Sequence, residues 1–135
     1  MIGSCVKVRY RFGNGRDYPT MVSNRVRREK SMVTALVQFK LPQAVTREKA
    51  KEIFSSTAPK YRDFHGLIRK YYLLSEDGKT GGGVYLWRSR EDAEQLYTDE
   101  WKRFIVEKYG AEPTVHYFAT PVVVDNLIGE ILTDE

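Results

Sequence analysis

The sequence predicts an α+β protein built on a four-stranded antiparallel sheet, and three observations predict it. β-branched and aromatic residues alternate with other side chains over residues 33–40, and two further strand-like runs flank a turn-rich insert at 75–79. Apolar residues recur at helical spacing over two stretches, which begin after Thr46 and Ser89. A last strand-like run, 114–124, follows the second stretch. The order of the elements is therefore β-α-β-β-α-β.

The first strand and the first helix are expected within residues 33–61. Strand positions 33, 35, 37 and 39 are Val, Ala, Val and Phe, so one face of the strand is apolar. Pro42 ends the strand, and Thr46 is expected to be the N-cap of the helix, with Glu48 in its first turn. Pro59 predicts that the regular helix stops near residue 57 or 58, with residues 60–65 as a shorter turn or a kinked continuation.

A β-hairpin is expected between residues 64 and 87. Asp77 and Gly78 supply the positive φ angle that a tight reversal needs, and three glycines at 81–83 allow a close approach to a neighbouring strand. Consecutive residues of a strand point to opposite faces, and in this hairpin both faces are rich in large side chains. An antiparallel sheet with one wet face alternates apolar with polar residues, so both faces are expected to be covered.

The second helix is expected to run without interruption from Ser89, its N-cap, to the breakers Gly110 and Pro113. Its apolar stripe is Ala93, Leu96, Tyr97, Trp101, Phe104 and Ile105. The strand 114–124 that follows is expected to bend at Pro121, which is tolerated at an edge or a bulge.

This order of elements is the split βαβ arrangement of ferredoxin-like domains. Right-handed crossovers place both helices on the same face of the sheet. The other face also carries large apolar side chains and would leave a patch larger than monomers usually expose. Two sheets packed face to face would bury that patch, so a homodimer with a twofold axis is expected, a dimeric α+β barrel in outline.

Charge divides the chain unevenly. Residues 1–31 hold eight Lys and Arg against two Asp and Glu, a net charge of +6, whereas the remainder holds 14 against 16, a net charge of −2. We expect a basic, flexible N-terminal extension at 1–31, a dimeric α+β barrel domain at 32–126 and a C-terminal tail at 127–135. The extension is interpreted as a tail or an over-long translation start, with a basic arm for nucleic acid as the alternative.

Composition excludes several classes of protein. With 41% hydrophobic and 30% charged residues the chain is typical of a soluble globular domain, and no apolar run is long enough to span a membrane. The single cysteine, Cys5, cannot form an internal disulfide, which favours the cytoplasm. There are too few Cys and His residues for a conventional zinc framework, so no metal is expected.

A set of motifs resembles the YdhR-type mono-oxygenase family. The motifs are, in order, APKYR at 58–62, GLIRKYY at 66–72, GGVYLW at 82–87, YTDEW at 97–101 and YGAEP at 109–113. The resemblance covers about residues 32–126. It implies the dimeric α+β barrel fold shared with antibiotic-biosynthesis and quinone mono-oxygenases. It also implies oxidation of a small phenol- or quinol-like aromatic compound with no cofactor, because the relatives of known activity use neither metal nor flavin.

Such a reaction needs a substrate that loses a proton, a group that favours the resulting anion, and a dry pocket. His116 is the candidate base, because imidazole titrates near neutral pH, and Arg69, with Lys60 and Lys70, is a candidate to hold a phenolate. The candidate substrate-binding rings, which would stack on a flat ligand, are Tyr61, Tyr71, Tyr72, Tyr85, Trp87, Tyr97 and Trp101.

Alternatives stay open. Each of these rings could equally be core, and His116 could be a structural strand histidine. A non-catalytic homodimer that binds a small aromatic molecule would use the same residues. An RNA-binding module is disfavoured, because the sequence lacks the Lys/Arg-Gly-Phe core of that signature and the folded part carries a net charge of −2.

Overall fold

The computed structural model describes residues 5–11, 17–23 and 31–134, with side chains over 31–134. The chain divides into two compact units. One unit is Met32–Ala119, and the other combines Met1–Ser31 with Thr120–Glu135. The expected domain boundaries at residues 31 and 126 stay a prediction.

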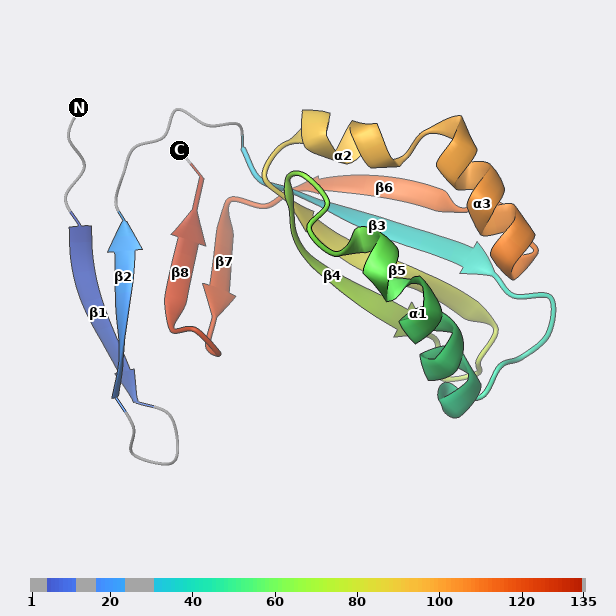
Figure 1. The fold of residues 1–135 in the computed structure, drawn as a ribbon, viewed down its shortest axis with the longest axis horizontal. Coiled ribbons are helices and arrows are strands. Elements are labelled where there is room, and N and C mark those ends of the chain that lie inside the picture. The colour runs from blue at the N-terminus through green and yellow to red at the C-terminus, as the bar shows by residue number, and fades with distance from the viewer. Residues whose placement is uncertain (1–4, 12–16, 24–30, 135) are drawn as a thin grey trace. The chain divides into compact units, whose positions relative to one another are not determined.

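The larger unit is built on an antiparallel sheet in the order β4-β5-β3-β6 (Figure 1). Its strands are β3 (Val33–Lys40), β4 (Leu67–Leu74), β5 (Thr80–Trp87) and β6 (Thr114–Ala119). The strand β3, which comes first of these four along the chain, lies between β5 and β6. The connection from β3 to β4 and the connection from β5 to β6 therefore each pass over a neighbouring strand, and both contain helices. This is the predicted ferredoxin-like α+β fold, and the fold class is confirmed.

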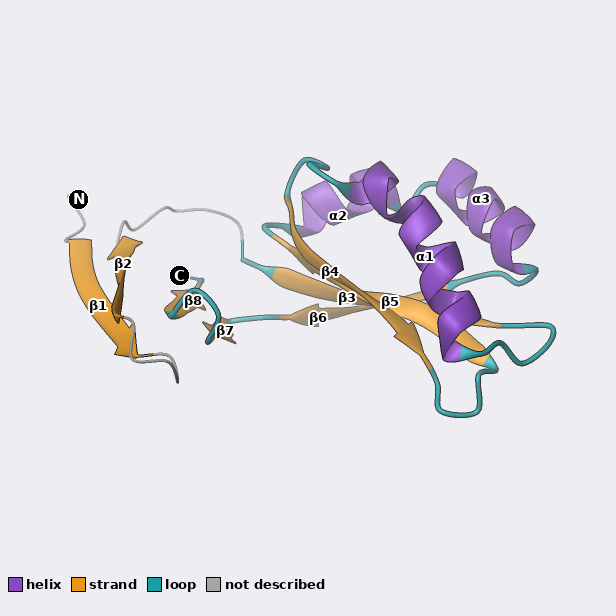
Figure 2. Cartoon of the chain, turned by 60° about the horizontal axis from the view of Figure 1, so that its bottom comes forward, coloured by secondary structure: helices purple, strands orange, loops and turns teal. Residues whose placement is uncertain are grey.

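Three helices lie on one side of the sheet, as Figure 2 shows. They are α1 (Arg47–Tyr61), α2 (Arg90–Leu96) and α3 (Asp99–Tyr109). Thr46 and Ser89 are confirmed as N-caps, because their hydroxyls accept from the backbone N–H groups of Lys49 and Asp92.

The second helical stretch is broken, contrary to the prediction of one continuous helix. Tyr97 leaves the helical conformation, and Thr98 begins α3 as a new N-cap, its hydroxyl accepting from the N–H of Trp101 at 3.2 Å. Asp99 and Glu100 follow in the first turn, where acidic side chains favour a helix start. The local sequence Thr-Asp-Glu therefore contained the signal for this second start.

Pro59 does not end α1, which continues to Tyr61. Proline removes one backbone hydrogen bond and crowds the preceding turn, so the last turn of α1 needs support from elsewhere in the fold. Tyr61 is buried in the core and accepts a hydrogen bond from Trp101, so tertiary packing holds the last turn.

The hairpin between β4 and β5 has the expected turn. Gly78 adopts a φ of 73°, which a side chain would strain. Strand β4 contains an irregularity between Leu67 and Arg69, after which the register continues without a break to Leu74. Beyond it, Lys70 and Tyr72 face the helices together with Tyr85 and Gly83 of β5.

The other face of the sheet bears no helix within Met32–Ala119. Tyr71 and Phe118 are more than half exposed there, at 53% and 54% of their surface, and Leu73 is also exposed. This face thus carries the large apolar side chains that the sequence predicts for it.

The smaller unit contains two hairpins, β1 (Cys5–Arg11) with β2 (Asp17–Ser23), and β7 (Val122–Asp125) with β8 (Glu130–Thr133). The predicted bend at Pro121 is in fact the end of the sheet, because the chain after Ala119 pairs with its own C-terminal segment rather than with β3. The absence of an N–H on proline explains why strand pairing stops there.

Candidate functional site

Six of the predicted aromatic residues lie together between the helices and the sheet. They come from α1, β4, β5, α3 and the loop between α2 and α3, and they are Tyr61, Tyr72, Tyr85, Trp87, Tyr97 and Trp101. Tyr97 is central, with its ring centroid 4.9 Å from that of Trp101, 5.5 Å from that of Tyr85 and 5.9 Å from that of Trp87. Trp87 is completely buried. We call this set the ring cluster.

Both indole N–H groups of the ring cluster are paired within it. The indole N–H of Trp101 donates to the hydroxyl of Tyr61 at 3.1 Å, and the indole N–H of Trp87 donates to the hydroxyl of Tyr97 at 3.0 Å. Among the described residues no buried side-chain nitrogen or oxygen lacks a hydrogen-bond partner. The ring cluster is therefore a filled and satisfied interior.

Burial also fixes the protonation of these tyrosines. It raises the pKa of Tyr85 and of Tyr97 well above the ordinary value, and it raises the pKa of Tyr72 to about 12. All three phenols consequently keep their protons near neutral pH. They can donate hydrogen bonds but cannot serve as bases.

Lys70 is enclosed by three rings of this interior. Its Nζ lies 3.3 Å from the ring centroid of Tyr61, 3.7 Å from that of Tyr72 and 4.6 Å from that of Tyr85. Ring faces attract a cation, by about 0.5–2 kcal/mol each. Burial acts the other way, with a smaller contribution from the charge of Lys60, and lowers the pKa of Lys70 to about 6. Near neutral pH the amine is thus mostly uncharged.

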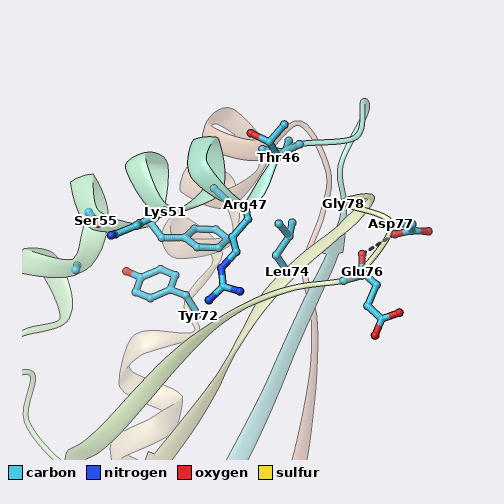
Figure 3. A pocket seen from close by; sticks show the side chains of 14 residues that line it. Thr46, Arg47, Lys51, Ser55, Tyr72, Leu74, Glu76, Asp77 and Gly78 are labelled. Carbon is cyan, nitrogen blue, oxygen red and sulfur yellow. Dashed lines mark hydrogen bonds between the residues drawn. The ribbon is translucent and has the colours of Figure 1, made fainter.

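A groove of about 720 Å³ lies between α1 and the edge strand β4, and the β4–β5 turn closes one end of it. Figure 3 shows Arg47 reaching from the start of α1 toward β4, where Tyr72 and Leu74 lie. Lys51 lines the same wall one helical turn later. Phe54 and Ala58 continue this wall with apolar surface.

Tyr72 separates the groove from the buried amine. The ring of Phe54 stacks on that of Tyr72 with centroids 4.9 Å apart, while Nζ of Lys70 lies 3.7 Å from the same centroid. A ring has two faces, so Phe54 takes one and Lys70 the other. The Tyr72 hydroxyl is 2.8 Å from that of Thr57, which fixes the ring in this position.

The charged side chains around the groove differ in whether they have partners. The side chains of Arg47 and Lys51 form no ion pair or hydrogen bond with another residue among 31–134. Asp77 accepts from the Ser75 hydroxyl at 2.7 Å and from the Lys79 N–H at 3.0 Å, and these bonds lower its pKa. Glu76 points away from Tyr72 at the rim (Figure 3). The groove therefore has two cations on α1 and two acidic residues in the β4–β5 turn, and only Asp77 of these four has side-chain hydrogen-bond partners among the described residues.

The remaining predicted residues lie on the opposite face of the sheet. Arg69 and Tyr71 align with residues of β5 that point away from the helices, and the Arg69 guanidinium donates to the Tyr71 hydroxyl at 3.5 Å. His116 pairs with Leu36 across the β3–β6 ladder and is exposed. The structure does not bring these three side chains together with the ring cluster.

Sequence reasoning missed the two cations of the groove. Arg47 and Lys51 are spaced by four residues on α1, and Phe54 and Ala58 continue the same face at the next helical intervals. A basic pair in line with an aromatic residue on one helix face was the available signal. It was overlooked because the apolar stripe alone was followed.

Residues 31–134 contain no group of three or more His, Cys, Asp or Glu side chains arranged to hold a metal ion. None of the helices in the described part of the chain is long and apolar enough to cross a membrane.

Comparison with known proteins supports the fold. No protein-family profile matches the sequence, and no curated protein sequence matches it. A monooxygenase of Streptomyces coelicolor, solved with the ligand nanaomycin D, is similar in structure with a TM-score of 0.53 and 16% identity, over 67% of this chain and 88% of that one. SnoaB, a cofactor-independent oxygenase of Streptomyces nogalater, is similar with a TM-score of 0.50 and 14% identity, over 67% and 93%.

A protein of unknown function from Bacteroides thetaiotaomicron is similar to the same extent, with a TM-score of 0.50 and 20% identity over 67% of this chain and 99% of that one. At such identities the likeness shows the fold alone. The chain has the ferredoxin-like fold found in monooxygenases of this kind, and its membership of the YdhR-type family stays a prediction.

We expect Lys70 to make stability depend on pH. Lys70 titrates near 10.5 in the unfolded chain and at about 6 in the folded protein, so between these values the unfolded chain binds the additional proton. Stability then rises as the pH increases from about 6 to about 9. Lys70→Met keeps the apolar stem and should remove this part of the slope. Urea denaturation at a series of pH values measures it.

The exposed substitution Lys102→Met is the control for the Lys70 experiment and should keep the wild-type slope. Identical slopes for the wild type and Lys70→Met would show that the amine is not held uncharged in the fold.

Proposed function

We propose that the protein is a cofactor-independent mono-oxygenase that acts on a small phenol- or quinol-like aromatic compound bound in the groove between α1 and β4. One observation carries the proposal. An aromatic and apolar groove, with Phe54 and Tyr72 in its walls and unpaired Arg47 and Lys51 beside them, lies in a fold that cofactor-independent oxygenases also have.

The two cations on the α1 wall of the groove suit the first chemical step. A nearby cation favours the charged form of a phenol, so Arg47 and Lys51 lower the pKa of a phenol bound beside them. The phenolate is electron-rich enough to reduce oxygen directly. One oxygen atom of O₂ then enters the ring as the second quinone oxygen, the other leaves as water, and the phenol supplies all four electrons. No external reductant is required.

The sequence suggests His116 as the base, but His116 lies on the helix-free face of the sheet, whereas the groove lies on the helix side. His116 could therefore act only on a substrate bound at the helix-free face, not on one bound in the groove of the same chain. Arg69 and Tyr71 share that face, whereas the buried members of the ring cluster would act by shaping and drying the interior.

A homodimer is part of the proposal. Tyr71, Leu73 and Phe118 expose large apolar surfaces on the helix-free face of the sheet. Such a surface is stabilised by burial against a second copy, and a twofold axis lets the same patch serve both chains. The two sheets would then pack face to face.

A non-catalytic binding protein is the second candidate. No fully buried side-chain nitrogen or oxygen in the described part of the chain lacks a hydrogen-bond partner, and the described residues that line the groove include no histidine or cysteine. These features favour binding without turnover.

Oxygen uptake distinguishes the two candidates. We expect a panel of phenols and quinols to contain substrates that consume one O₂ per quinone formed, without added reductant, and Tyr72→Leu to reduce turnover by about tenfold because it removes the ring that walls the groove. Binding with no oxygen uptake across the panel would reject the oxygenase and favour the non-catalytic binding protein.

The substitution His116→Ala tests the base that the sequence suggests, and circular dichroism should show that the fold is spared. The sequence alone predicts lowered turnover, whereas a substrate bound in the groove predicts turnover equal to that of the wild type, because His116 lies on the other face of the sheet. Equal turnover would remove His116 from the mechanism, and lowered turnover would contradict a reaction confined to the groove.

Sedimentation tests the dimer. We expect a dimer at micromolar concentration, and we expect Phe118→Asp to convert it to a monomer because a charge would be buried in the interface. Val106→Asp places the same charge on an exposed apolar position of α3 and should leave the dimer intact. A wild-type chain that sediments as a monomer at this concentration would contradict the proposed assembly.

A further inference from the structure

The groove combines two chemically different walls, and this combination specifies a ligand more narrowly than an aromatic ring alone. One part is apolar, formed by Phe54, Tyr72 and Leu74. The other part carries Arg47 and Lys51. A neutral aromatic molecule would satisfy the first part and leave the second without a partner.

Both cations are available to a ligand. They sit four residues apart on α1, so their side chains project from the same face of the helix. Neither has an ion-pair partner within residues 31–134. The neighbouring Lys49 does have one, since its Nζ lies 3.5 Å from Glu52 Oε1, and it does not line the groove.

The groove also contains two acidic residues, and both lie in the β4–β5 turn rather than on α1. The Asp77 carboxylate is engaged by the Ser75 hydroxyl and the Lys79 N–H within the turn. Glu76 is directed outward at the rim (Figure 3). Both acids belong to the β4–β5 turn, which meets the start of α1 through the Val45 N–H to Gly78 C=O hydrogen bond of 2.9 Å, so a bound carboxylate is best placed further along α1, between Arg47 and Lys51.

From these contacts we propose that the groove selects planar aromatic acids. The ring would lie against Phe54, Tyr72 and Leu74, and the carboxylate would be held by Arg47 and Lys51. Arg47 can meet a carboxylate with two parallel N–H donors, whereas Lys51 acts as a point charge. This inference rests on the proposed function in taking the ligand to be aromatic, and it adds the acid group.

Calorimetric titration with two probes of equal shape tests the charge requirement. We expect 2-naphthoate to bind roughly tenfold more tightly than the neutral 2-naphthamide, because only the acid can pair with the two cations. We expect the double substitution Arg47→Gln, Lys51→Gln to remove this preference while leaving amide binding unchanged. The control Lys49→Gln should keep the wild-type preference.

The dependence of affinity on salt concentration tests the same charge requirement independently. Raising the ionic strength from about 0.05 M to about 0.5 M should weaken naphthoate binding and leave naphthamide binding unaffected. Equal affinity for the two probes, survival of the preference in the double variant, or failure of both probes to bind would each overturn the inference.

The outcome is separable from that of the oxygenase proposal. A preference for naphthoate with no oxygen uptake on hydroxynaphthoates would retain the inference and reject the oxygenase. Oxygen uptake with equal affinity for the acid and the amide would reject the inference and retain the oxygenase.

Discussion

The packing of six aromatic side chains between the helices and the sheet is the constraint on which the rest of the structure depends. The indole N–H groups of Trp87 and Trp101 are paired with tyrosine hydroxyls inside this layer, so the rings are held by hydrogen bonds as well as by burial. Because the interior is occupied by the protein's own rings, the groove forms at its margin, where α1 meets the edge strand β4.

The groove at this margin shares one residue, Tyr72, with the interior. Tyr72 contacts Lys70 and Thr57 in the interior, and it also lines the groove, where its ring stacks on that of Phe54. Room for this arrangement depends on Gly83, where a Cβ would lie 3.0 Å from Tyr85 Cε1 and 3.5 Å from Lys70 Cε. A small residue in β5 thus permits a lysine and three tyrosines to share one side of the sheet.

The sequence predicted the fold because periodicity, caps and turn residues all agreed. Thr46, Ser89 and Gly78 occupy the positions expected of them. The break at Thr98 was missed because the apolar stripe continues across it, and the stripe reports which face is buried rather than whether the helix is continuous. The candidate site was only partly predictable, since alternation along a strand does not say which face the helices cover. His116 and Tyr71 were therefore grouped with rings from which the sheet separates them.

The central claim is that a ligand binds at the groove and leaves the ring cluster intact, and NMR chemical shifts during titration with 2-naphthoate test it most directly. The chain has two tryptophans, both in the ring cluster, so their indole N–H signals report on the interior. The account predicts shifts of the backbone amides of Arg47, Lys51 and Tyr72 with the two indole signals unmoved. Large shifts of both indole signals, with the amides of α1 unchanged, would contradict it.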